Sequence, residues 1–229
     1  MENNRHSFVK RIFSETGSTY ELVVALTTLG LDSSWKKRIV HIAQGHKNPR
    51  NILDLACGTG ILTRALARTF PESQITAVDL QEEYIRQAEK KNREYGIATV
   101  KFQVKSAESV CTGEYDIITA SYLPKYVNLD VVIENCSKIL RPEGIIIFHD
   151  FIYPEDPLLR ALYDGYWMIL GPLLWLSCTW REMSRELKSL IAETHWVDDL
   201  RKALVSNGFR DITEEVQKFQ TAAIISARN

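Results

Sequence analysis

Several features that mark common protein classes are scarce in this sequence. The 229 residues include four cysteines, at positions 57, 111, 136 and 178, without close pairing or the spacing of a metal site. We therefore expect no metal site and a reduced, cytoplasmic setting. The N-terminus lacks the apolar stretch of a signal peptide, and no segment offers about 18 uninterrupted apolar residues. These absences argue against secretion and against a transmembrane helix.

An excess of charge of either sign is also missing, since the formal net charge is −1. Basic residues are scattered, and the densest cluster, Trp35-Lys36-Lys37-Arg38, is interpreted as the solvated face of a helix. The sequence has no Asn/Asp-Pro-Pro-Tyr type motif of the kind used on a base extruded from a duplex. We therefore expect no nucleic-acid partner.

What the sequence does contain is an alternation of short apolar strands and amphipathic helices. The first 48 residues are predicted to be helical, with Gly30 ending one helix and Ser33-Ser34 capping the next. A turn at Arg141-Pro142-Glu143-Gly144 is predicted to launch the fifth strand. Strands are predicted near 51–55, 74–79, 99–104, 115–120, 144–150, 210–217 and 219–227, and helices near 60–70, 82–94, 128–140 and 196–207. This order predicts an α/β fold with a doubly wound, mostly parallel, seven-stranded sheet.

The most informative segment is Asp54-Leu55-Ala56-Cys57-Gly58-Thr59-Gly60, which follows a strand and leads into a helix. Its glycines allow a tight turn and a close ligand approach, and the helix start supplies N–H groups that favour anionic ligand groups. A dinucleotide fingerprint would add a third glycine, which is absent. A second acid, Asp79, ends the next strand. The pattern resembles motifs I and II of class I S-adenosylmethionine (SAM) methyltransferases, whose fold is Rossmann-like.

This resemblance implies a SAM site at the carboxyl ends of the strands. Asp79 suits the ribose diol because a carboxylate can accept two hydroxyl hydrogen bonds. Leu80 is expected to pack on adenine, and Tyr20 to close over the cofactor. Ser106 stands where related enzymes commonly have Asp. The residues expected to bind SAM are Tyr20, Asp54, Ala56, Cys57, Gly58, Gly60, Asp79, Leu80, Ser106, Ala107 and Ser121.

The chain is further similar to the ubiquinone/menaquinone biosynthesis C-methyltransferase family. Residues 52–60 match the motif I of that family closely, and Leu140-Arg141-Pro142-Glu143-Gly144 matches its Leu-Lys-Pro-Gly-Gly turn. The resemblance implies transfer of a methyl group from SAM to a small lipophilic or aromatic acceptor, at carbon or oxygen, with a quinone precursor as one case. Two alternatives stay open: an unrelated small acceptor such as a thiol or natural product, and a non-catalytic SAM-fold binding protein.

The departures from the family lie at the acceptor end. The family typically has Phe-Gly-Leu-Arg-Asn-Val after the fourth strand, where this chain has Tyr122-Leu123-Pro124-Lys125-Tyr126-Val127. Lys125 therefore replaces an arginine and cannot make its planar bidentate contact. His149 is the leading candidate for a general base, with a purely structural imidazole as the alternative. The candidate catalytic residues are His149, Asp150, Lys125, Tyr122 and Tyr126.

An uncharged run at 165–178 forms the middle of a helical insertion. Three interpretations compete for the segment 163–180: a buried lid over a hydrophobic acceptor, a homodimer interface, and a peripheral membrane contact, which would make the protein membrane-associated. We predict one domain, 1–229, in which 1–48 form a helical cap, 49–153 the SAM-binding core, 154–195 the helical lid inserted after the fifth strand, and 196–229 the closing helix and strands.

Overall fold

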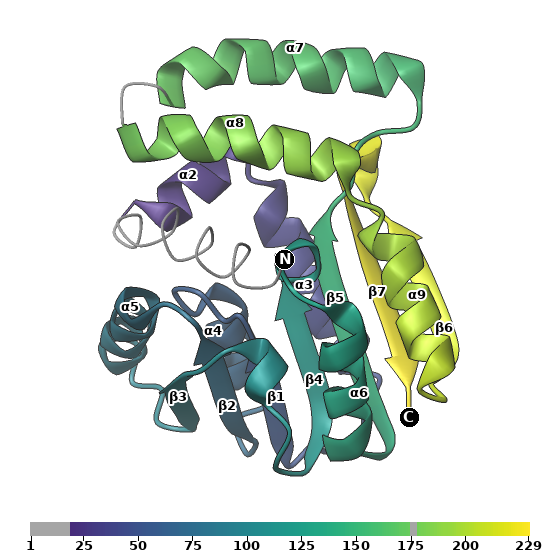
Figure 1. Cartoon of the computed structure of the whole chain (residues 1–229). Coiled ribbons are helices and arrows are strands. Elements are labelled where there is room, and N and C mark those ends of the chain that lie inside the picture. Colours follow the sequence, from purple (N-terminus) through teal and green to yellow (C-terminus); the bar gives the residue numbers. More distant parts are fainter. Residues whose placement is uncertain (1–18, 175–177) are drawn as a thin grey trace.

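The computed structural model describes residues 19–174 and 178–229, so the first 18 of the 48 residues predicted to be helical lie outside the described residues. Its centre is a seven-stranded sheet in the order β3-β2-β1-β4-β5-β7-β6 (Figure 1). The five strands β1 to β5 run parallel, and β7 is antiparallel to both β5 and β6. The strands are β1 Asn51–Leu55, β2 Gln74–Asp79, β3 Val100–Val104, β4 Tyr115–Ser121, β5 Leu140–Phe151, β6 Arg210–Val216 and β7 Ala222–Arg228. The predicted doubly wound, mostly parallel sheet is confirmed.

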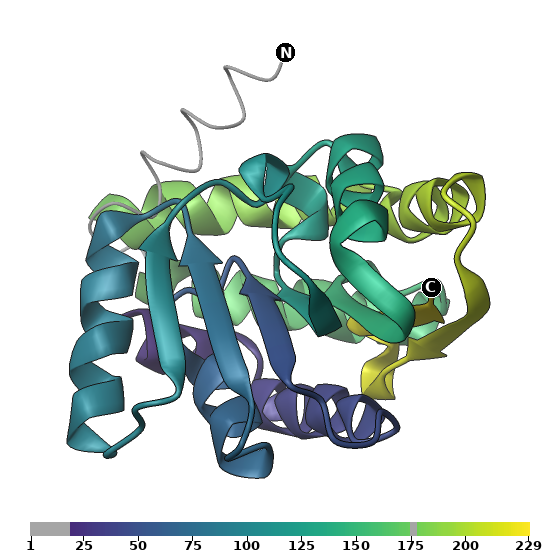
Figure 2. The same ribbon diagram turned by 90° about the horizontal axis from the view of Figure 1, so that it is seen from below.

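The helices form a layer on each face of this sheet (Figure 2). Helices α3, α4 and α5 cover one face, and α6 and α9 cover the other. The helices are α2 Tyr20–Thr27, α3 Leu31–Ala43, α4 Ile61–Thr69, α5 Glu82–Glu94, α6 Leu129–Ile139, α7 Pro157–Leu174, α8 Cys178–Glu193 and α9 Trp196–Ser206. Three single turns of 3₁₀ helix are η1 Ala107–Ser109, η2 Pro124–Tyr126 and η3 Lys218–Gln220.

The predicted first residue of α3 and the predicted solvent exposure of Trp35 and Lys36 were wrong. The helix begins at Leu31 after Gly30, whose φ of 76° is left-handed, and the predicted cap at 33–34 lies inside its first turn. Trp35 and Lys36 are only 2% and 6% exposed, so they do not form a solvated face. The reason is the 3.6-residue period, which places Asp32, Trp35, Lys36 and Ile39 on one side of the helix, toward the sheet.

Two boundaries in the second half also differ from the sequence prediction. The predicted turn at 141–144 is an irregularity within β5, where Glu143 takes a φ of 63° and the pairing with β4 shifts register. The last strand begins at Ala222 and not at 219, because η3 occupies 218–220. The side-chain oxygen of Gln220 accepts backbone N–H groups of Glu155 and Asp156 there. Local turn residues alone do not reveal these two adjustments.

The helical insertion lies over the carboxyl edge of the sheet, with α8 between α7 and α2 (Figure 1). Its inner side forms a separate apolar cluster in which Trp167, Leu170 and Trp180 pack with Val23 of α2. The Trp180 Nε1 donates to Thr19 Oγ1 at 3.1 Å, which ties α8 to the start of α2. No helix within residues 19–174 and 178–229 combines the length and the apolarity that crossing a bilayer requires.

Candidate active site

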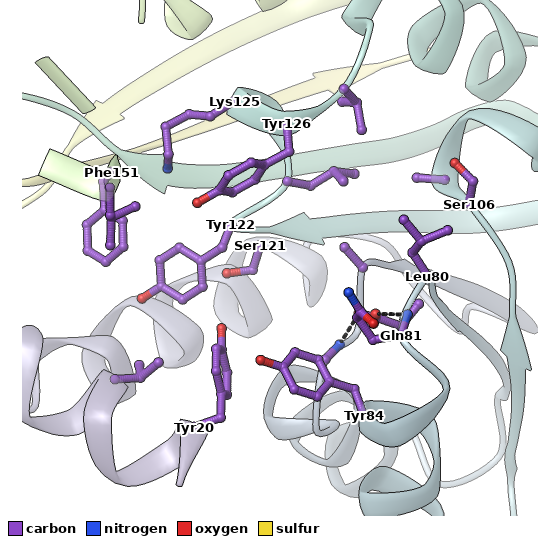
Figure 3. Close-up of a pocket in the computed structure, with 18 of the residues that line it drawn as sticks. Tyr20, Leu80, Gln81, Tyr84, Ser106, Ser121, Tyr122, Lys125, Tyr126 and Phe151 are labelled. Atoms are coloured by element: carbon purple, nitrogen blue, oxygen red, sulfur yellow. Dashed lines mark hydrogen bonds between the residues drawn. The ribbon is translucent and has the colours of Figure 1, made fainter. Parts of the chain in front are cut away.

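A cavity of about 130 Å³ lies at the carboxyl edge of the parallel strands and is called the main cavity. Figure 3 shows its two ends, with Leu80 and Ser106 at one and Tyr122 and Phe151 at the other. The predicted site residues that line it are Tyr20, Ala56, Gly58, Asp79, Leu80, Ser106, Ala107, Ser121, Tyr122, Lys125 and Tyr126. The fold therefore brings residues from α2, four strand ends and η2 together around one space.

The glycine turn after β1 forms a wall of the main cavity. Gly58 and Gly60 take φ angles of 55° and 81°, and Ala56 takes 53°, so the chain turns sharply before α4. The carboxylate of Asp79 accepts the Gly58 N–H and the Gln81 N–H, both at 2.8 Å. Burial raises the pKa of Asp79 to about 6, although these backbone donors oppose the rise. Asp79 thus fixes the turn and faces the cavity.

Asp54 contacts a smaller cavity of about 30 Å³, called the side cavity, which Cys57 also lines. The Asp54 carboxylate accepts hydrogen bonds from Thr63 Oγ1 at 2.5 Å and Thr119 Oγ1 at 2.8 Å. Burial raises the pKa of Asp54 to about 6 despite these two donors. Its oxygens therefore connect β1, α4 and β4 as well as facing the side cavity. Gly60 lines neither space but permits the turn through its left-handed φ.

His149 and Asp150, predicted together as catalytic candidates, point to opposite faces of the sheet. Successive residues of a strand alternate, so Ile147 packs with α3 and α4 while Phe148 packs with α6 and α9. His149 therefore lies on the α3 side, where Trp35 approaches its ring with centroids 5.3 Å apart. Both candidates are fully buried and neither lines the main cavity. Sequence adjacency did not place them in one site.

His149 reaches the main cavity only through a neighbour. Its Nδ1 lies 2.9 Å from Ser121 Oγ, and its Nε2 has no hydrogen-bond partner among the residues that the structure describes. Burial lowers the pKa of His149 well below its usual range, and the charges of Lys36 and Lys125 lower it further. The imidazole is therefore neutral. Its role as a general base stays a prediction, and the path that the geometry offers runs through Ser121.

On the other face, Lys125 and Asp150 form a buried ion pair. Both side chains have no exposed surface, and the Lys125 ammonium donates to Asp150 Oδ1. The Phe151 N–H donates to the same oxygen at 2.7 Å. Burial lowers the pKa of Lys125 well below its usual range. Lys125 and Tyr126 line the main cavity from η2, on the side where Tyr122 and Phe151 lie.

The structure adds residues that the sequence analysis missed. Asp32 and Lys36 of α3 line the side cavity, and Tyr84 and Phe151 line the main cavity. One sequence signal was available: two opposite charges spaced i, i+4 occupy the same helix face as the apolar Trp35. A charged pair on an apolar stripe is a sign of a buried polar site and not of a solvated surface.

Glu21, at the start of α2, clamps that helix to the glycine turn. Its Oε1 accepts a hydrogen bond from Thr59 Oγ1 at 2.8 Å and lies 3.0 Å from Arg64 Nη2 and 2.6 Å from Lys91 Nζ. Burial raises the pKa of Glu21, but the hydrogen bonds from Lys91 and Thr59 and the charges of Lys91 and Arg64 lower it overall. The clamp sets Tyr20, the preceding residue, over the main cavity, where its ring lies on Tyr84 with centroids 5.2 Å apart.

The sequence of residues 1–223 matches the ubiE/COQ5 methyltransferase family. The chain belongs to this family. It is 26% identical over 218 residues to the ubiquinone/menaquinone biosynthesis C-methyltransferase UbiE of Pseudomonas paraeruginosa, a match that covers 93% of this chain and 85% of the relative. A relative of the same description from Shewanella pealeana is 28% identical over 163 residues. That alignment covers 69% of this chain and only 64% of the relative, which is less than two thirds of its length.

The fold is shared with a solved methyltransferase structure. The magnesium protoporphyrin IX methyltransferase of Synechocystis PCC 6803, solved with bound SAM, superposes with a TM-score of 0.66 at 16% identity. The match covers 98% of this chain and 97% of that protein. The family model thus confirms the predicted family, and the superposition confirms the Rossmann-like sheet.

Proposed function

We propose that this chain transfers the methyl group of SAM to a carbon of a small, hydrophobic acceptor that carries a phenol- or enol-type hydroxyl, such as a quinone precursor. The observation that carries the proposal is the continuity of the main cavity. One end offers Asp79 and Leu80 for the ribose and adenine of SAM, and the other offers Tyr122 and Lys125 to an acceptor. Methyl transfer needs this alignment of two ligands in a water-poor space more than it needs an acid, because the leaving thioether is neutral.

The acceptor end favours an apolar ligand. Phe151 and Thr27 line both the main cavity and a third cavity of about 230 Å³, called the outer cavity. Aromatic and aliphatic side chains of α7, among them Leu162 and Trp167, form much of the wall of the outer cavity. A ring held beside Tyr122 would therefore have room for an apolar substituent. The names of the curated relatives support a quinone precursor as the first acceptor to test.

The test has two parts. Isothermal titration with SAM and with its demethylated product measures cofactor binding, and absence of binding for both would contradict every enzymatic interpretation. Incubation with labelled SAM and a panel of quinols, phenols and thiols then identifies the acceptor. Label in a quinol or phenol ring supports the proposal, whereas label in a thiol alone would favour the alternative of an unrelated acceptor. Tight SAM binding without any transfer would favour a non-catalytic binding protein.

The outer face of α7 supports a further apolar contact. Leu158, Leu162, Met168 and Ile169 are 62–78% exposed on this helix. A peripheral membrane contact would place this face against lipid and bring a lipophilic acceptor to the outer cavity, and a homodimer through 163–180 would cover the same face. Flotation with lipid vesicles and sedimentation velocity distinguish the two, and Met168→Glu should weaken whichever contact forms.

Replacing His149 with alanine is expected to lower turnover about tenfold, which is less than the roughly 100-fold or more that a group transferring the proton itself contributes. The reason is that Ser121 loses its partner and the Tyr122 ring, 5.0 Å from the imidazole centroid, loses its support. The dissociation constant of SAM should stay within about threefold, since His149 lines no part of the main cavity. Unchanged turnover would remove His149 from the mechanism.

Replacing Glu21 with glutamine is expected to raise the dissociation constant of SAM about two- to fivefold, the range of a partly exposed ion pair. The Glu21 side chain is 35% exposed, so the effect should shrink as salt is added. Because the pKa of Glu21 is lowered, wild-type protein should lose the clamp only when the pH falls below the usual range of a glutamate.

The matched control is Glu134→Gln, which removes an exposed pair with Lys138 on α6. Equal SAM affinity for Glu21→Gln and wild type at low salt would show that the clamp does not hold α2 over the cofactor.

A further inference from the structure

A network of five polar side chains lies in the buried space between α3 and the ends of β4 and β5. Tyr122 donates its hydroxyl to Asp32 Oδ1 at 2.6 Å, and Lys36 Nζ lies 3.0 Å from the same carboxylate oxygen. Lys36 Nζ also donates to Ser121 Oγ at 2.5 Å. Ser121 Oγ in turn lies 2.9 Å from His149 Nδ1. This network therefore joins α3, β4 and β5 and ends on the neutral imidazole of His149.

Within this network, Tyr122 lines both the main cavity and the side cavity. Its ring is held on three sides: Phe151 stacks at 4.7 Å between centroids, His149 stands edge-on at 5.0 Å, and Lys36 Nζ lies 4.2 Å from the ring centroid. Its backbone has a φ of 61°, a left-handed conformation that is strained for a residue other than glycine. Strain and packing together hold the phenol in one position.

The hydroxyl of Tyr122 has capacity left for a ligand. A phenol donates one hydrogen bond and can accept others, and the donor of Tyr122 is already committed to Asp32. An incoming hydroxyl group can therefore only donate to Tyr122 Oη. Burial, with the nearby charge of Asp32, raises the pKa of Tyr122 well above its usual range, so the phenol stays protonated.

Asp32 is buried among polar and charged side chains of four elements. Asp32 is 6% exposed, and its charged neighbour on α3 is Lys36. The Lys36 ammonium also donates a hydrogen bond to Ser121 Oγ. The other titratable groups facing this space are Tyr20 of α2, His149 of β5 and Asp54 of β1. Lys125 of η2 lies at the acceptor end with its own partner, Asp150. Asp32 thus accepts a hydrogen bond from Tyr122, whose hydroxyl-bearing side chain lines the main cavity.

The geometry points to a proton relay in which Tyr122 takes the proton of the acceptor hydroxyl and Asp32 takes the proton of Tyr122. This inference rests on the proposed function and assigns the acceptor a hydroxyl at Tyr122 Oη. Tyr122 is the catalytic residue, because it touches the acceptor, and Asp32 is a positioning residue that acts through it. Lys36, Ser121 and His149 hold the pair in place.

The step balances in protons and electrons. The acceptor O–H bond breaks, its proton joins Tyr122 Oη, and the Tyr122 proton passes to Asp32 Oδ1. The electron pair left on the acceptor oxygen is delocalised onto the ring carbon, which forms a bond to the methyl group as the methyl–sulfur bond breaks and its pair stays on sulfur. The ring carbon then releases its hydrogen as a proton to water, and Asp32 returns its proton through Tyr122 to the acceptor oxygen, which regains its hydroxyl.

The kinetic test compares wild-type protein with Tyr122→Phe and Asp32→Asn, each assayed with acceptor phenols of different acidity. Both variants should lose about 100-fold in turnover on a weakly acidic phenol, within the usual range for a proton-transfer group, and keep their affinity for SAM. A nitro-substituted phenol, ionised at neutral pH, should restore turnover in both, because no proton has to be removed. The pH profile of Asp32→Asn should follow the ionisation of the acceptor itself.

The control Asp198→Asn changes an exposed aspartate of α9 and should leave turnover unchanged. A uniform loss in Tyr122→Phe and Asp32→Asn that an acidic phenol does not restore would overturn the relay and indicate a structural role.

A binding measurement keeps the relay testable if the wild-type protein transfers no methyl group, an outcome that would contradict the proposed function alone. In the presence of demethylated SAM, wild-type protein should bind 4-methylphenol, which stays protonated at neutral pH, about three- to tenfold more tightly than 4-methylanisole, the usual range for one hydrogen bond. Tyr122→Phe should abolish that preference and Asp198→Asn should keep it. Equal binding of the two ligands by wild-type protein would overturn the placement of an acceptor hydroxyl on Tyr122.

Discussion

Replacing Lys125 with methionine is expected to lower the free energy of unfolding by about 3–5 kcal/mol, because it leaves Asp150 charged, buried and without its partner. Both side chains have no exposed surface, and the remaining donors to Asp150 are the backbone N–H groups of Phe151 and Lys125. Asp150→Asn should also destabilise, since the Lys125 ammonium then lacks a counter-charge. The pKa of Lys125, already lowered by burial, lets the amine become neutral and softens that second loss.

Urea unfolding of the two single variants and of Lys125→Met/Asp150→Asn completes a double-mutant cycle. The double variant should be more stable than the sum of the single losses implies, because neither charge remains unpaired. The matched control is Lys138→Met, whose pair with Glu134 is more than half exposed and should contribute little to stability. A loss for Lys125→Met no larger than that of Lys138→Met would contradict the buried pair.

Replacing Asp79 with asparagine is expected to weaken SAM binding about 10- to 100-fold, since hydrogen bonds to a charged group contribute about 1.5–3 kcal/mol. The amide can still accept one of the two N–H groups, from Gly58 or Gln81, but its NH₂ group faces the other. Titration calorimetry measures the change, with Asp198→Asn as the exposed control. An unchanged dissociation constant would show that Asp79 holds the glycine turn without contacting the ribose.

The pH dependence of SAM binding follows from the same carboxyl. Burial raises the pKa of Asp79 from its ordinary value of 3.8 to about 6, so the folded protein takes up this proton more readily than the unfolded chain. Between about pH 6 and 3.8 this group therefore stabilises the fold as the pH falls, while the ribose loses its charged acceptor. SAM affinity should drop below about pH 6 in wild-type protein. Asp79→Asn should retain only the part due to Asp54, whose pKa is also about 6.

The cofactor half of the site could be predicted from the sequence because its elements are local. A strand, a glycine turn and a helix lie within residues 51–69, and a carboxylate at the end of the next strand meets the turn across neighbouring parallel strands. Cys57 and Asp79 belong to that same unit. Side-chain periodicity and the need for a positive φ at glycine depend on only a few neighbouring residues. The local residue pattern therefore predicts both features directly.

The acceptor half could not be predicted in the same way. Neighbouring positions 149 and 150 were grouped because they adjoin in sequence, but the alternation of a strand sends them to opposite faces of the sheet. Asp32 and Lys36 were missed because their partners, Tyr122 and Ser121, follow 90 and 85 residues later. The only local sign of these contacts is the i, i+4 spacing of two opposite charges on an apolar helix face.

The sequence by itself therefore determined the fold class and the place where SAM is expected, through the hydrophobic period and the glycine turn of residues 54–60. The tertiary structure decided which side chains face the end of the main cavity that is proposed for the acceptor. The packing of α3 against the ends of β4 and β5 buries Asp32 beside Tyr122, and the packing of η2 against β5 buries Lys125 beside Asp150. The physical reason is that burial and long-range contact change the chemistry of a charged group, and both exist only once distant elements have packed together.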